Sequence, residues 1–459
     1  MEQIVHVVHC IDTEGPLYEG LDVKFERLKN IFGITHLDPT QQNFDKICRG
    51  EIPLGGKEAV IQQTFSSHLT NYMDDWQKLD AMLARAMDDR FRMAVPDSFG
   101  GPFLYNWFCV DHVEYVSNPR RRAMGYLAIF DHFQALINKQ KGYRDGLQWH
   151  MHPMSTYKEA HRCATSLLNS PHAWEGLARR VIDRHWFPSC FRAGFHVERP
   201  DLHWFLEQYV PFDYSNTSTE DEDEMESQAD LANGRFGDWR LAPKDWGVYH
   251  PSRDNYQIPG DGRRWMARAL NVLNRFANIT PREVEKALQQ AQEGKPTLLC
   301  IGSHDYRDLV PEVTHFRQLL VDAQKKFPNV KFKYGEAQQA FQAVAYQGKT
   351  GAPVRLDVRM ERFSNGTPKA LHIQTRQGKV FGPQPFLALK TKSQRYIHDN
   401  LDFGTDLHSW HYVFDAQSVL PDDLETVGVA TCDAFGNVDV HVIPGYEPAA
   451  EKQPAGALR

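Results

Sequence analysis

The sequence predicts an α/β protein, a distorted seven-stranded (β/α) barrel followed by a small all-β domain with a sandwich-like pattern. First, short apolar strand-like segments alternate with helix-like segments over the first three-quarters of the 459 residues, which indicates parallel βα units. Second, after residue 350 short alternating segments separated by Gly, Asn and Pro replace this pattern, which favours an antiparallel β domain. The length also suits two domains.

The strand-like segments of the first part are short and apolar, and turn residues bound them. We expect strands at residues 4–12, 103–111, 146–152, 189–194, 211–215, 296–302 and 330–334. Helix-like patterns occur at residues 120–138, 155–168, 199–209, 265–292, 312–326 and 336–345. Seven such units suit a distorted parallel barrel with helices on the outside.

The domain limits follow from these patterns. We expect the barrel over residues 1–347, with insertions at about 15–100 and 216–262, the first containing a helix at residues 76–90. The second insertion carries the acidic run 220–224, which we interpret as a solvated loop. The all-β domain is expected over residues 351–446, with strands near 354–358, 370–374, 410–414, 426–430 and 438–442. Residues 447–459 are expected to form a loose tail.

Composition excludes several classes of protein. The net charge of −7 argues against a nucleic-acid or anionic-membrane surface. The sequence shows no apolar span and no signal-peptide pattern, and its seven cysteines form no CxxC pair. We therefore expect a cytoplasmic protein with a reducing environment and no membrane span.

Two pairs of polar residues at strand ends indicate a metal site. His150 and His152 are two residues apart at the end of a strand-like run, and Asp12 and Glu14 follow another. Residues i and i+2 of a strand point to the same side, so each pair can reach one ion. The alternative interpretation is a pair of solvated loop histidines and an N-capping aspartate.

The expected metal ligands are Glu14, His150 and His152, which leave positions open for water and substrate. His161 is a rival third ligand. Carboxylate and imidazole ligands suit Zn2+ best, and they also accept cobalt, nickel or manganese.

Three further residues could supply the chemistry of hydrolysis, because active sites of α/β barrels form at strand ends. Asp12 could take the proton of a metal-activated water as general base. Arg192 could hold Asp12 ionised, and His304 could protonate the leaving amine. The alternatives are a structural ion pair for Arg192 and a capping loop for His304.

The substrate-binding candidates are four residues near these strand ends. They are Trp149, Asp213, Trp246 and Tyr249. Aromatic rings can stack on a sugar, although they can equally be ordinary core packing. Asp213 can alternatively cap the turn that follows it.

An ordered set of motifs resembles the polysaccharide deacetylases of the NodB-homology type. The resemblance covers residues 4–345 and rests on Ile11-Asp12-Thr13-Glu14, Trp149-His150-Met151-His152-Pro153, Phe191-Arg192-Ala193-Gly194, Phe212-Asp213-Tyr214-Ser215 and Ile301-Gly302-Ser303-His304-Asp305. It implies a seven-stranded distorted barrel, an aspartate base, a metal-binding acid and a histidine acid. The Asp-x-acid and His-x-His spacings resemble an intracellular-type variant, and the metal acid is Glu14 where aspartate is commoner.

We therefore expect a metal-dependent hydrolase that deacetylates an N-acylated sugar, sugar nucleotide or polysaccharide precursor. One alternative is hydrolysis of a non-sugar C–N bond, such as a cyclic amide or ureide, because fold does not determine substrate. Another is a binding protein that keeps the barrel without its chemistry. The expected partner is a carbohydrate or other small molecule, with no nucleic acid, and the oligomeric state stays open, a homo-oligomer included.

Overall fold

The computed structural model describes residues 3–140, 142–159, 166–168, 170–196, 198–220 and 239–447. The chain divides into two compact units. Unit 1 consists of Met1–Ala173 and Ser189–Thr350, and unit 2 consists of Trp174–Pro188 and Gly351–Arg459. His161, residues 221–224 of the acidic run and nearly all of the expected tail lie outside the described residues.

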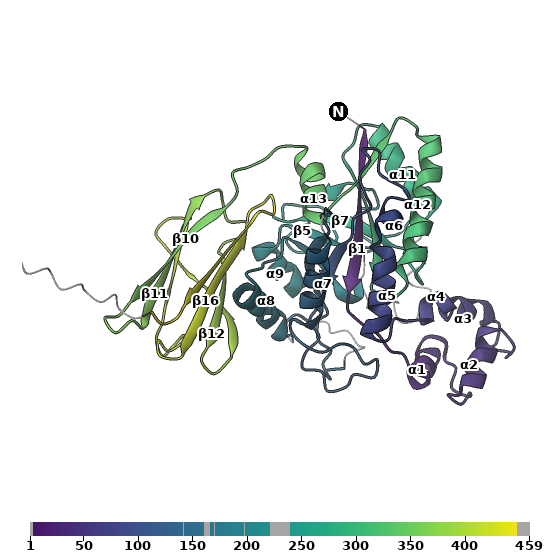
Figure 1. Cartoon of the computed structure of the whole chain (residues 1–459), viewed down its shortest axis with the longest axis horizontal. Helices are drawn as coiled ribbons and strands as arrows, with labels where there is room; N and C mark the ends of the chain where they lie inside the picture. The colour runs from purple at the N-terminus through teal and green to yellow at the C-terminus, as the bar shows by residue number, and fades with distance from the viewer. Residues whose placement is uncertain are drawn as a thin grey trace, which may run out of the picture. The chain divides into compact units, whose positions relative to one another are not determined.

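Seven parallel strands close into a barrel in unit 1, and Figure 1 labels three of them, β1, β5 and β7. They are β1 (Ile4–Thr13), β2 (Asn106–Cys109), β3 (Gly146–Met151), β4 (Cys190–Ala193), β5 (Phe212–Asn216), β7 (Trp265–Asn271) and β8 (Thr297–His304). The ring closes because β1 pairs in parallel with both β8 and β2. This confirms the α/β barrel class predicted from the sequence.

Two more strands extend this sheet. β9 (Lys331–Tyr334) pairs in parallel with the first half of β1, so it lies outside the closed ring. β6 (Val248–Tyr249) pairs antiparallel with β7. The last strand expected from the sequence therefore exists, but it is not one of the seven that close the barrel.

The expected helix at 265–292 is wrong over its first part. Residues Trp265–Asn271 form β7, and the helix α11 (Pro281–Gln292) begins only after the N-cap Thr280, whose side chain accepts from the Glu283 amide. All but one residue of β7 are buried, and a strand covered on both faces shows no alternation that would separate it from a helix. Arg268 within β7 is buried because it pairs with Glu283, at 2.7 Å.

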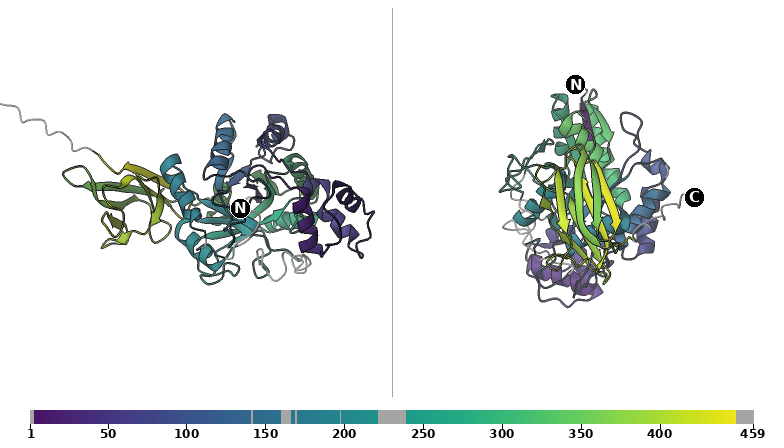
Figure 2. Two further views of the ribbon diagram at one scale, coloured as in Figure 1. Left: turned by 90° about the horizontal axis from the view of Figure 1, so that it is seen from below. Right: turned by 90° about the vertical axis from the view of Figure 1, so that its left-hand side faces the viewer.

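The helices of unit 1 lie around the strands when the molecule is seen from below (Figure 2). They are α5 (Trp76–Ala86), α6 (Asp89–Arg92), α7 (Ala128–Lys139), α9 (Pro200–Tyr209), α11, α12 (Leu309–Lys326) and α13 (Ala337–Tyr346). α5 shows why these segments are helical. Asp75 caps it by accepting the Lys78 amide, and the residues at one-turn spacing, Leu79, Met82, Leu83 and Ala86, are the buried ones.

The first part of the first insertion, residues 21–70, forms a small helical layer with its own core. Its helices are α1 (Leu21–Phe32), α2 (Gln41–Cys48), α3 (Glu58–Thr64) and α4 (Ser67–Thr70). Leu28, Phe44, Ile47, Ile61 and Phe65 are among the residues that pack together between them.

Two helices differ from the expectation. The helix expected at 120–138 begins only at Ala128. The Asn118 side chain stabilises a loop in the preceding backbone, because it accepts from the Arg122 amide at 2.9 Å and donates to the Arg122 carbonyl at 3.0 Å. The expected helix at 155–168 is absent from described residues 155–159 and 166–168. A helix follows later instead, α8 (His172–Arg184), most of which belongs to unit 2.

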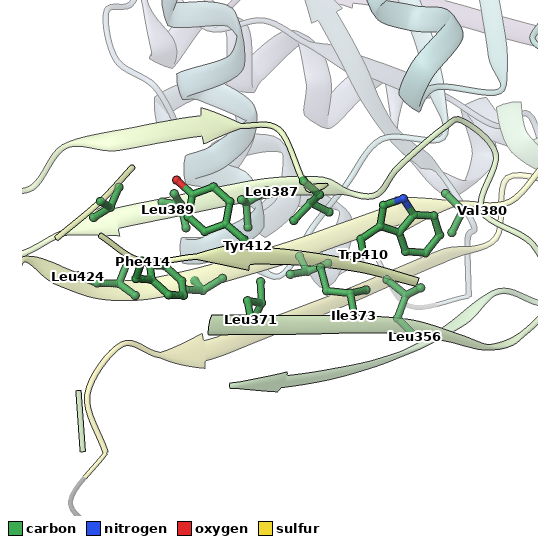
Figure 3. Close-up of a cluster of buried hydrophobic side chains, with 14 of the residues drawn as sticks. Leu356, Leu371, Ile373, Val380, Leu387, Leu389, Trp410, Tyr412, Phe414 and Leu424 are labelled. Atoms are coloured by element: carbon green, nitrogen blue, oxygen red, sulfur yellow. The ribbon is translucent and has the colours of Figure 1, made fainter. Parts of the chain in front are cut away.

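Unit 2 contains two four-stranded antiparallel sheets. The first has the order β10 (Arg355–Arg362), β11 (Pro368–Gln377), β15 (Ser409–Val413), β14 (Asp402–Phe403), and the second β13 (Tyr396–Asp399), β12 (Phe386–Thr391), β16 (Leu424–Cys432), β17 (Val438–Pro444). Side chains from both sheets, including Leu371, Trp410, Leu387 and Leu389, share one buried cluster (Figure 3). The right view of Figure 2 shows the strands side by side.

Residues 174–188 pack within unit 2 on the second sheet. The Tyr396 hydroxyl donates to the Asp183 carboxylate at 2.9 Å, and the Phe187 and Phe386 rings lie 5.5 Å apart. Gly428 makes this possible, since a Cβ there would lie 2.6 Å from Val181. In the described part of the chain, no helix combines the length and the hydropathy needed to cross a bilayer.

Candidate metal centre

The site forms at the carboxyl ends of the first barrel strands. The β1–β8 register places Asp12 beside His304, and the β3–β4 register places His150 beside Arg192. Glu14 follows directly after β1. The parallel barrel thus brings together polar residues that are up to 292 positions apart in the chain, as the sequence predicts for strand ends.

Glu14, His112 and His152 form a buried group that could hold a metal ion. One ligand atom from each lies within 4.8 Å of the other two, and Glu14 Oε1 is 3.2 Å from His152 Nε2. Nδ1 of His152 is buried without a hydrogen-bond partner. An unpaired buried polar atom costs about 1–3 kcal/mol, and ligation would offset that cost.

The donor set itself fits a divalent ion. One carboxylate oxygen and two imidazole nitrogens are the three protein ligands of many catalytic zinc sites, which keep further positions open. Burial, followed by the nearby Arg122 and His152, holds the pKa of His112 well below its ordinary value. Burial, partly opposed by Glu14, likewise lowers the pKa of His152. Neutral imidazoles are the form that binds metal.

His112 was not among the residues expected from the sequence. It stands directly after the predicted strand 103–111, in the same kind of position as His152. Because polar residues at the ends of barrel strands meet at one end of the barrel, His112 could have been predicted as a site residue from its position.

His150, which was expected to be a ligand, lies beside this group. Its Nδ1 is 2.8 Å from the Arg192 carbonyl oxygen, which can only accept, so Nδ1 carries the proton. Its Nε2 therefore presents a lone pair, 3.0 Å from His152 Nε2 and 3.9 Å from Glu14 Oε1. Metal-binding histidines usually donate their other ring N–H to a carbonyl or carboxylate in this way. The Nε2 lone pair of His150 is available to the same ion.

Arg122 and Asp305 hold Glu14 in place. Arg122 Nη1 forms a buried ion pair with Glu14 Oε2, which leaves Oε1 facing His152. Asp305 accepts the backbone N–H groups of Glu14 and Gly15, at 2.9 Å and 2.8 Å. Burial alone would raise the pKa of Glu14, but Arg122 and His152 outweigh it and hold this pKa well below its usual range. The carboxylate is thus ionised and oriented.

The two carboxylate oxygens of Asp12 have different surroundings: Oδ1 is hydrogen-bonded to Arg192, and Oδ2 faces His304. Arg192 Nε donates to Asp12 Oδ1 at 2.7 Å, and Nη1 donates to the Tyr214 carbonyl at 2.8 Å. Burial would lower the pKa of Arg192, but Asp12 raises it overall, so the guanidinium stays charged. Asp12 Oδ2 is 3.8 Å from His304 Nε2. The sequence placed all three residues in the site, and the structure brings them together.

The backbone after β4 fits closely around His152. A Cβ on Gly194 would overlap the His152 ring and lie 2.6 Å from the Met151 carbonyl oxygen. Phe195 and His196 follow with φ values of 53° and 55°, and the Phe195 ring packs 4.5 Å from His152. Such backbone strain is typical of functional sites.

Three of the four expected substrate-binding residues are in the interior. Trp149 is 1% exposed and packs against Phe191. Trp246 is fully buried, and its Nε1 donates to the Glu283 carbonyl at 3.0 Å. Deep burial takes both indole faces out of reach of a sugar, because other side chains already cover them.

Asp213 and Tyr249 lie in a separate buried polar network. Asp213 is fully buried, with Oδ2 3.2 Å from Arg264 Nε, so it forms an internal ion pair and is not open to substrate. Its other oxygen accepts the Ser215 amide at 2.8 Å, which is the turn-capping alternative. Tyr249 is half-buried, and its hydroxyl donates to the Tyr256 carbonyl at 3.2 Å.

No family model, no curated protein and no solved structure matches this chain. The chemistry of the site therefore rests on its own geometry. That geometry consists of a buried carboxylate–imidazole group, an adjacent aspartate paired with an arginine, and a histidine that faces the aspartate.

Proposed function

We propose that this protein is a metal-dependent amide hydrolase that deacetylates an N-acylated sugar or sugar-containing precursor. The observation that carries the proposal is the buried Glu14–His112–His152 group, with Asp12 Oδ2 next to it and facing His304 at 3.8 Å. A metal-ligating group, a base and a hydrogen-bond donor that faces the same space are parts that metal-assisted amide hydrolysis uses.

Glu14, His112 and His152 would hold the ion, and Zn2+ suits a set of one carboxylate and two imidazoles. A divalent ion supplies Lewis acidity there, which lowers the pKa of water and polarises a carbonyl group. Arg122 and Asp305 keep Glu14 pointing at that position.

Asp12 is the base of the proposed reaction. Its Oδ1 is occupied by Arg192, so Oδ2 is the atom that takes a proton from the attacking water. Arg192 holds the carboxylate in place through a charge-assisted hydrogen bond. His304 Nε2 faces the same space and donates to the substrate on the side of the leaving nitrogen.

The sugar substrate rests on the resemblance to polysaccharide deacetylases, and with it we propose a NodB-like barrel with an accessory β sandwich. A specific observation also supports a second candidate, hydrolysis of a non-sugar amide or ureide. Trp149 and Trp246 are buried, so two of the aromatic rings that would favour a sugar cannot stack on one.

A substrate panel separates these candidates. Zinc-reconstituted protein would be assayed for acid release from N-acetylglucosamine oligosaccharides and from cyclic amides, beside Asp12→Asn and the surface control Asp74→Asn. We expect the wild type and Asp74→Asn to hydrolyse the sugar and Asp12→Asn to lose about 100-fold to 10,000-fold in kcat. Hydrolysis of the cyclic amides alone would favour the second candidate. No hydrolysis of either class would favour a binding protein.

A further inference from the structure

Arg307 contacts the ring nitrogen of His304 that faces away from Asp12. Arg307 Nη2 is 3.2 Å from His304 Nδ1, and the Arg307 amide donates to the His304 carbonyl at 3.2 Å. Arg307 is 4% exposed, so water does not substitute for this contact. The pair belongs to the turn between β8 and α12.

Two other groups hold the Arg307 guanidinium in this position. Arg307 Nη1 donates to Asn274 Oδ1 at 3.1 Å. Arg307 Nε lies 3.1 Å from Glu312 Oε1, on a glutamate side chain that is fully buried. Nη1 and Nη2 each have a hydrogen-bond partner, and Nε pairs with Glu312 by charge without a hydrogen bond. The hydrogen bond of Nη1 and the ion pair of Nε hold Nη2 as the donor toward His304.

This contact determines which nitrogen of His304 carries the proton. A guanidinium only donates, so His304 Nδ1 has to accept and has to be unprotonated. The proton of the neutral ring is then on Nε2, the atom that faces Asp12. Burial, followed by the charge of Arg307, also holds the pKa of His304 well below its ordinary value.

We propose that Arg307 is a positioning residue that keeps His304 as a neutral Nε2–H donor, so that Asp12 carries the proton in both halves of the reaction. The kinetic part of this inference rests on the proposed function. A second protonation of His304 would place a proton on Nδ1 against Arg307, and this is the form that a histidine acid requires.

The proton balance is complete without an acidic His304. One hydrogen of the water moves to Asp12 Oδ2 as the water oxygen attacks the acyl carbon. When the C–N bond breaks, the leaving nitrogen takes that proton, and Asp12 returns to its carboxylate. The second water hydrogen stays on the carboxylic acid product, which releases it to solvent. His304 Nε2–H stabilises charge on the substrate by hydrogen bonding and loses no proton.

Nitrogen NMR tests the tautomer without any substrate. We would label the histidines with nitrogen-15 and assign His304 by the signals lost in His304→Gln. We expect a protonated Nε2 and an unprotonated Nδ1 at neutral pH in the wild type, and a mixture of tautomers in Arg307→Gln. The control Arg85→Gln removes an exposed arginine from a pair with Asp308, and it leaves the His304 signals unchanged.

A second variant controls for destabilisation, because Arg307→Gln alone removes the arginine from the buried Glu312 and leaves it only the contact with His68 at 3.2 Å. Arg307→Gln/Glu312→Gln removes both charges and is expected to show the same mixture of tautomers. A doubly protonated His304 in the wild type, or a tautomer unchanged by both Arg307 variants, would overturn the inference.

The kinetic test compares two replacements of His304. Glutamine retains a neutral N–H donor and alanine retains none, so we expect kcat of His304→Gln to exceed that of His304→Ala by about 10-fold. Equal loss in both variants would overturn the donor role. If the wild type hydrolyses nothing, the proposed function fails, while the NMR result still decides the role of Arg307.

Discussion

Gly194→Ala tests whether the backbone after β4 is shaped around His152. The new Cβ would overlap the His152 ring and lie 2.6 Å from the Met151 carbonyl oxygen, where real Cβ atoms are essentially never found within 3.0 Å. Gly194 is not in the left-handed region of φ, so the substitution acts through crowding alone.

The magnitude of the effect has two parts. Forcing one methyl group into a packed interior costs about 1–3 kcal/mol of folding free energy. The His152 side chain can move more easily than the Met151 backbone, the other group that the new Cβ contacts. We therefore expect its ring to move away from Glu14 and His112. Displacing an oriented ligand lowers metal affinity by about 10-fold to 100-fold, which corresponds to about 1.4–2.7 kcal/mol.

Two measurements on two variants separate these parts. Zinc affinity would be measured by competition with a chelating dye, and stability by urea unfolding of the metal-free protein. Gly335→Ala is the matched control, because its Cβ would lie 2.8 Å from Ala340 Cβ at the other end of the barrel. We expect both variants to lose stability and only Gly194→Ala to lose affinity. Wild-type affinity in Gly194→Ala would refute the reasoning.

Three further predictions follow from individual contacts. Asp305→Ala removes the acceptor of the Glu14 and Gly15 amides, so the urea-derived stability should fall by about 1–3 kcal/mol, and no loss would contradict the holding role of Asp305. Gly302→Ala places a Cβ 2.9 Å from Arg192 Nη2, so kcat should fall by about 10-fold with metal content unchanged; wild-type kcat would show that Arg192 need not be held. Burial, followed by Arg317, lowers the pKa of His9 from 6.5 to about 3. The unfolded chain therefore binds more protons between these values, and His9 makes stability fall by about 1.4 kcal/mol per pH unit as the pH drops below 6.5. Urea unfolding at several pH values should show a smaller slope in His9→Gln, and equal slopes would contradict this.

The barrel could be predicted from the sequence because its strands are short apolar runs between helices. β7 could not, since a strand buried on both faces lacks the alternation that marks a strand, and the sequence does not show that the charged Arg268 within it is buried. Its pairing with Glu283 and its hydrogen bonds to the Ser218 and Lys244 carbonyls make that burial possible, and such partners are not visible in sequence.

The candidate site was partly predictable for a related reason. The expectation that polar residues at strand ends meet at one end of the barrel brought Asp12, Glu14, His152 and His304 together. His112 also follows a predicted strand, so the same expectation could have included it. The sequence pattern predicts Arg122 within a helix at 120–138, whereas it lies in the loop before α7, so only the fold reveals its ion pair with Glu14. The expected substrate-binding residues agree least with the structure, because a sequence does not show whether an aromatic ring such as that of Trp246 is buried.

The most direct test of the central claim is the metal content of the purified, zinc-reconstituted protein, measured by elemental analysis beside His112→Ala/His152→Ala. Folding of both proteins would be verified by circular dichroism. The account predicts about one divalent ion per wild-type chain and none in the folded double variant. An equal metal content in the two proteins, or none in the wild type, would contradict it.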